Sequence, residues 1–226
     1  MTIRFARGEE GAMVARRIAW LPALAMAGAL AYAVAPRKSD LRGFEPAGMA
    51  RLETAMWRDY YERHYPSLFY HLYESSRAQF GFSPLDSFRI ALAAAQAAGA
   101  FQPTHSRAEA AAALPHLFVY YGLLRAAAPA AFEVAAAANL ELDWWQARRE
   151  QVAPGDYGVT IARVAALTYG TPAEGTAMLA YGIGRAQAMA YRDARGAGIN
   201  EQDWSSIEAQ LREAYQQLKL AIVPSA

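Results

Sequence analysis

The chain has 226 residues, with 22 basic and 21 acidic side chains and a formal net charge of +1 at neutral pH. A chain with so little net charge and no basic stripe offers no general attraction to phosphates, so we expect no nucleic-acid partner. It contains no cysteine, which excludes disulfides, thiolate metal sites and cysteine nucleophiles.

Residues 18–36 form a run without a single charge, bounded by an arginine pair at 16–17 and a basic pair at 37–38. As a helix this run would span ~28 Å, close to the thickness of a bilayer's hydrocarbon core. We therefore assign residues 1–37 to a signal anchor or a signal peptide, with the membrane as a partner through residues 18–36. The length of the run favours an anchor, whereas the Ala-Tyr-Ala sequence at 31–33 fits a cleavage site.

The basic residues around this segment give a weak indication of its orientation. Four arginines precede the run, while Arg37, Lys38 and Arg42 follow it. This excess favours an N-terminus inside the cell and a main domain outside the cytoplasm, in the periplasm; the cytoplasmic side is the alternative.

We expect a linker at 38–46. In residues 47–226, the spacing of helix-capping residues is typical of one all-α domain. Ser83, Ser106, Thr171 and Asn200 each resemble an N-cap, and no window alternates with the period of a strand. We predict a single helical bundle of about seven to eight helices, preceded by an N-terminal hydrophobic helix. The expected helices cover 47–65, 67–80, 84–101, 107–127 with a kink at Pro115, 130–152, 157–169, 172–195 and 201–221.

Several charged residues fall on the apolar sides of these helices when successive residues are placed ~100° apart. In the first helix, Glu53 and His64 lie among aromatic side chains, and Glu141 and Arg148 flank two tryptophans in helix 130–152. In helix 172–195, two arginines share a stripe with methionines, and Gly182 and Gly184 would admit a close backbone. The predicted buried polar cluster comprises Glu53, His64, Glu141, Arg148, Arg185 and Arg192.

Two interpretations of this cluster remain open. Buried charges must be paired, hydrogen-bonded or neutralised, so the cluster is either a set of structural ion pairs or the lining of a pocket. A pocket would accept a small or amphiphilic ligand. No Glu-x-x-His motif is present, and the pair formed by His71 and Glu74 has the reverse order, so we predict no metal site; the sequence identifies no cofactor.

The function that best fits these features is that of a membrane-anchored all-α binding or accessory protein with a buried polar pocket. One alternative is a metal-dependent helical-bundle enzyme that uses Glu53, His64 and Glu141. Another is a structural subunit of a membrane complex, held by a protein partner.

Overall fold

The computed structural model describes residues 22–35, 37, 39–127 and 131–223. All regular structure within these ranges is helical, which confirms the predicted all-α class. Beyond residue 45, the described chain forms nine α-helices, one of them a single turn. They are α2 (Pro46–Glu62), α3 (Tyr65–Glu74), α4 (Pro84–Phe101), α5 (Arg107–Ala110), α6 (Leu114–Ala127), α7 (Val134–Arg149), α8 (Pro154–Tyr169), α9 (Thr176–Arg195) and α10 (Glu201–Ile222).

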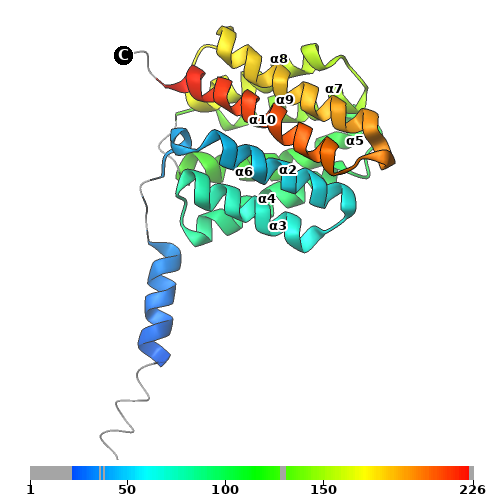
Figure 1. Ribbon diagram of the computed structural model, residues 1–226. Helices are drawn as coiled ribbons and strands as arrows, with labels where there is room; N and C mark the ends of the chain where they lie inside the picture. The colour runs from blue at the N-terminus through cyan, green and yellow to red at the C-terminus, as the bar shows by residue number, and fades with distance from the viewer. Residues whose placement is uncertain (1–21, 36, 38, 128–130, 224–226) are drawn as a thin grey trace, which may run out of the picture.

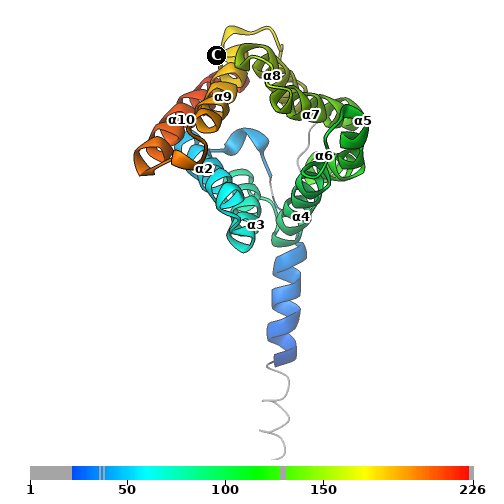
Figure 2. The ribbon, with the colours of Figure 1, turned by 90° about the vertical axis from the view of Figure 1, so that its right-hand side faces the viewer.

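Eight of these helices form a closed ring that is one helix thick, as the view along its axis shows (Figure 2). Each helix packs against the next in the order α2, α3, α4, α6, α7, α8, α9 and α10. The ring closes because α10 also packs against α2, which puts the last helix beside the first (Figure 1). An apolar stripe of α10 lies in this closure, with Trp204, Ile207 and Leu211 all buried.

Helices α8 and α9 approach each other closely at two glycines, Gly158 and Gly182. A Cβ atom built on Gly182 would lie 2.6 Å from the backbone nitrogen of Ala162 and would collide with the carbonyl oxygen of Gly158. A Cβ on Gly158 would lie 2.7 Å from Cα of Ile183. The predicted close approach at Gly182 is therefore confirmed, and Gly184 makes only ordinary contact with Ala214 of α10.

Several helix ends differ from the prediction. The expected helix 107–127 is divided into α5, a 3-10 turn at Ala111–Ala113 and α6, because Pro115 can occupy only the first turn of a new helix. The expected start at 172 was wrong, since α9 begins at Thr176. The stretch 67–80 changes at Ser75–Gln79 into a π-helix, which places two serines toward the interior of the ring.

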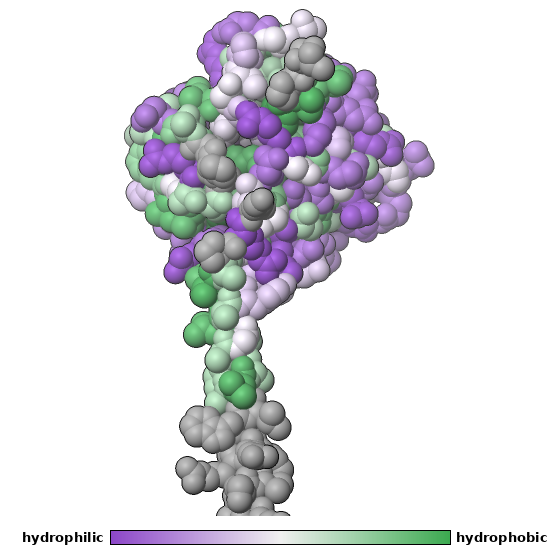
Figure 3. All heavy atoms as spheres, turned by 90° about the vertical axis from the view of Figure 1, so that its left-hand side faces the viewer, coloured by the Kyte–Doolittle hydropathy of each residue, from purple (hydrophilic) through white to green (hydrophobic). Residues whose placement is uncertain are grey.

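The N-terminal helix covers residues 22–34 of the described chain and projects from the ring (Figure 1). Its surface is mostly apolar, in contrast to the largely hydrophilic bundle beside it (Figure 3). Tyr32 accepts a hydrogen bond from Arg77 at 2.9 Å. No helix among the described residues combines the length and the apolar character needed to cross a bilayer, so the predicted membrane helix is not confirmed. Residues 18–21 and 36 of the predicted segment lie outside the described ranges.

The residues expected to form a linker contribute to the core. Leu41, in a 3-10 turn at Leu41–Gly43, and Phe44 are buried at one end of the ring. Lys219 of α10 donates hydrogen bonds to the carbonyl oxygens of Arg42 and Phe44, and Tyr169 donates one to that of Leu41. These bonds give partners to three backbone carbonyl oxygens and hold the segment against α8 and α10.

Candidate functional site

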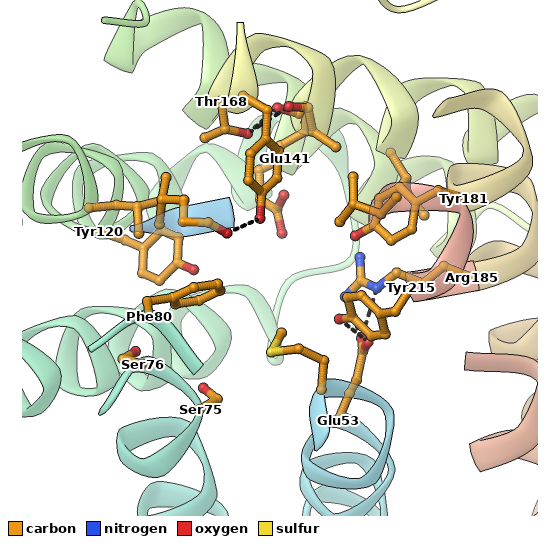
Figure 4. A pocket seen from close by; sticks show the side chains of 18 of the residues that line it. Glu53, Ser75, Ser76, Phe80, Tyr120, Glu141, Thr168, Tyr181, Arg185 and Tyr215 are labelled. Carbon is orange, nitrogen blue, oxygen red and sulfur yellow. Dashed lines mark hydrogen bonds and ion pairs between the residues drawn. The ribbon is translucent and has the colours of Figure 1, made fainter. Parts of the chain in front are cut away.

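The ring encloses a cavity with two connected parts. The inner chamber, of about 280 Å³, lies between the tyrosines of α6, α8, α9 and α10. The side chamber, of about 550 Å³, lies between α2, α3, α4 and α6. Eight residues line both chambers, among them Glu53, Tyr120, Glu141 and Arg185, and the region that they share is the junction of the chambers. Figure 4 shows these four side chains around the inner chamber. The combined space is within the size range of small-molecule sites.

An ion pair between α2 and α9 forms one side of the junction. Glu53 is 3% exposed, and its Oε1 accepts a hydrogen bond from Nε of Arg185 at 2.8 Å. In the same ion pair, Nη2 of Arg185 lies 2.6 Å from Oε1. Its other oxygen, Oε2, accepts a hydrogen bond from the Tyr215 hydroxyl at 2.6 Å. Both oxygens therefore have donors, which lowers the cost of burying the carboxylate.

Burial and charge act in opposite directions on Arg185. Burial favours the neutral guanidine, but the attraction of the Glu53 carboxylate outweighs it and holds the pKa of Arg185 above its ordinary value. Burial is also the largest cause of the raised pKa of Tyr215, and it raises the pKa of Tyr181 to about 12. The tyrosines at this junction therefore remain neutral hydroxyls at neutral pH.

A second carboxylate, that of Glu141 on α7, faces the same junction. Its Oε2 accepts a hydrogen bond from the Tyr121 hydroxyl at 2.9 Å, and its Oε1 accepts one from Nε1 of Trp145 at 3.0 Å. Burial and the nearby Glu141 charge together raise the pKa of Tyr121 well above its ordinary value, so Tyr121 remains a donor. Trp145 lies one helical turn from Glu141, which positions its indole over the carboxylate.

The side chamber has an apolar wall of small residues. Ala94, Ala95, Ala98 and Gly99 of α4 line it opposite Leu68 of α3. None of the α3 residues is fully buried, whereas each of the other long helices of the ring has several buried residues. The small side chains of α4 leave the space that α3 does not fill.

Three members of the predicted cluster, Glu53, Glu141 and Arg185, come together at this junction, and the other three do not. The position predicted for His64 was wrong: α2 ends at Glu62, Arg63 adopts a left-handed conformation with φ of 62°, and the chain then turns. The His64 side chain is 61% exposed and lies near Glu62, with 3.4 Å between Nδ1 and Oε2.

Arg148 and Arg192 lie together away from the junction. Arg148 donates to Asp193 at 2.9 Å and to the Tyr61 hydroxyl at 2.6 Å. The guanidinium of Arg192 lies over the Tyr61 ring, 3.0 Å from its centroid, and 3.7 Å from Asp193. These contacts link α2, α7 and α9, which fits the interpretation of structural ion pairs for these two arginines.

The residues proposed for metal binding do not gather. Glu53 is buried and His64 is exposed, so the set required by the metal-dependent enzyme is separated by the turn after α2. His71 forms a hydrogen bond with Asp59 at 2.7 Å instead. Across the described ranges, no group of three or more histidine, aspartate or glutamate side chains is placed to hold a metal ion.

No protein-family model matches the chain, and neither the curated proteins nor the solved structures contain a significant match.

Proposed function

We propose that this chain is a binding protein that holds a small amphiphilic ligand inside the helical ring. The polar group of the ligand would lie at the junction of the chambers, and its apolar part would lie in the side chamber. The observation that supports this most directly is a charged junction that opens onto a larger apolar space. A core built only for stability fills such a space with side chains, because voids reduce stability.

We further propose that residues 18–36 hold this protein at a membrane, with the ring outside the cytoplasm. The uncharged run, its basic flanks and the apolar surface of residues 22–34 support this proposal. Expression of the full chain should give a membrane fraction that resists extraction by carbonate and is released by detergent. Deletion of residues 1–37 should release a folded helical protein. Full recovery of the intact chain in the soluble fraction would contradict the anchor.

Filling the side chamber should block binding. The substitution Ala95→Phe places a large side chain in this space, so the affinity for 1-decanol should fall about tenfold or more. The quenching of tryptophan fluorescence in titrations of the full chain, held in phosphatidylcholine nanodiscs, measures this change, with empty nanodiscs as the blank.

The neighbouring substitution Gln96→Phe is the matched control. Gln96 belongs to the same helix and is exposed, so its replacement should leave decanol binding unchanged. Equal affinities for the wild type and Ala95→Phe would show that decanol does not bind in the side chamber. An absence of saturable binding of any ten-carbon amphiphile to the wild type, whether its head group is neutral or charged, would contradict the proposed function.

A further inference from the structure

Glu141 differs from Glu53 in the partners that surround its charge. The charge of Glu53 is balanced by Arg185, whereas both donors to Glu141 are neutral groups, a phenol and an indole. No arginine or lysine in the described part of the chain forms an ion pair with Glu141. The junction thus contains two carboxylates and one guanidinium, and the Glu141 charge remains unbalanced.

Both oxygens of the Glu141 carboxylate accept hydrogen bonds from uncharged side chains. The indole N–H of Trp145 can only donate, so Oε1 must accept. The Tyr121 hydroxyl donates to Oε2, so both oxygens act as acceptors. The two donors occupy both oxygens without supplying a positive charge.

Aromatic side chains surround the space beside this carboxylate. Tyr120, Tyr121, Trp144 and Tyr181 all line the inner chamber, as does Glu141. The guanidinium of Arg185 already lies over the Trp144 ring, 5.3 Å from its centroid. Aromatic faces attract organic cations, and a carboxylate in an aromatic enclosure is the arrangement that recognises ammonium groups.

We infer that the polar group of the ligand is a cation: an amine or a quaternary ammonium that lies against Glu141 among these aromatic rings. This inference rests on the proposed function, because it specifies the ligand of the same cavity. An ammonium group restores charge balance at the junction without disturbing the pair between Glu53 and Arg185. The alkyl part then extends into the side chamber, between α3 and the alanines of α4.

Three probes with the same ten-carbon chain test this inference: decyltrimethylammonium, 1-decanol and decyl sulfate. Each is titrated, below its critical micelle concentration, into the full chain in phosphatidylcholine nanodiscs, and tryptophan quenching gives the affinity. The wild type should bind decyltrimethylammonium about tenfold or more tightly than 1-decanol, and decyl sulfate most weakly. Equal affinities for the cation and the alcohol, or preference for the sulfate, would overturn the assignment.

The substitution Glu141→Gln keeps the shape of the side chain and removes its charge. It should lower the affinity for decyltrimethylammonium about tenfold and leave that for 1-decanol unchanged. Glu133→Gln, which removes an exposed charge next to the start of the same helix, is the control and should retain the full preference. A preference for the cation that survives Glu141→Gln would assign recognition to another group and overturn the inference.

The outcomes separate the two proposals. Saturable binding of 1-decanol without preference for the cation would retain the proposed function and reject the ammonium site. An absence of binding by all three probes would reject both. The comparison of probes on the wild type needs no variant, so it decides the inference even if Glu141→Gln fails to fold.

Discussion

Replacing Gly182 with alanine should destabilise the ring by about 3 kcal/mol or more, even though alanine is the better helix former by about 1 kcal/mol. The added Cβ would meet the carbonyl oxygen of Gly158 and the backbone nitrogen of Ala162, and a rigid backbone cannot move aside as a flexible side chain can. Helices α8 and α9 would have to separate. Urea unfolding followed by circular dichroism measures the loss.

The substitution Gly122→Ala is the matched control, and it should not lower the stability of the ring. Gly122 lies within α6, and a Cβ there would have no neighbour within 4 Å. Only the helix propensity remains, so this variant should be as stable as the wild type or up to about 1 kcal/mol more stable. If Gly182→Ala behaves like Gly122→Ala, the close approach of α8 to α9 does not exist.

The second large effect is expected at Glu53. The substitution Glu53→Gln removes the charge that neutralises Arg185 and leaves a guanidinium in the interior without its counter-charge. Breaking one partner of a buried pair costs about 3–5 kcal/mol. The free energy of unfolding in urea should fall by this amount.

A double variant tests whether the loss of stability comes from leaving one charge buried without its partner, because it removes both charges at once. Glu53→Leu combined with Arg185→Met removes both charges and should recover most of the stability that Glu53→Gln loses. Glu201→Gln is the exposed comparison, because the pair between Arg58 and Glu201 lies at the surface and should contribute little. If Glu53→Gln is as mild as Glu201→Gln, the Glu53 carboxylate is not buried in a pair.

Helices with local capping signals were predicted well. Ser83 accepts a hydrogen bond from the backbone of Asp86, and α4 covers the expected residues 84–101. Asn200 and Asp203 form a full capping box at the start of α10. By contrast, the side chain of Thr171 caps no helix, because the chain remains irregular until Thr176. A capping residue indicates a possible start, and tertiary packing decides whether the helix begins there.

The candidate site was predictable only in part, since helical periodicity gives the side on which a residue lies but not the helix that it faces. It placed Glu53, Glu141 and Arg185 on inward sides, and all three lie at the junction of the chambers. It could not supply Tyr121 or Tyr215 as their partners, because these come from other helices. The inward position predicted for His64 was wrong because the turn at Arg63 changes the helical phase, and no local sequence pattern indicates this turn.

The closure of the ring by α10 has a consequence for synthesis on the ribosome. Glu53 is translated before its two donors, which follow 132 and 162 residues later. Until Arg185 and Tyr215 have left the exit tunnel, burial of the Glu53 carboxylate would cost free energy because it has neither donor. During this time α2 therefore remains exposed to water or bound to a chaperone. A nascent chain that ends before α10 leaves uncovered the faces of α2 and α9 that contact α10, so the ring closes only after α10 has been synthesised.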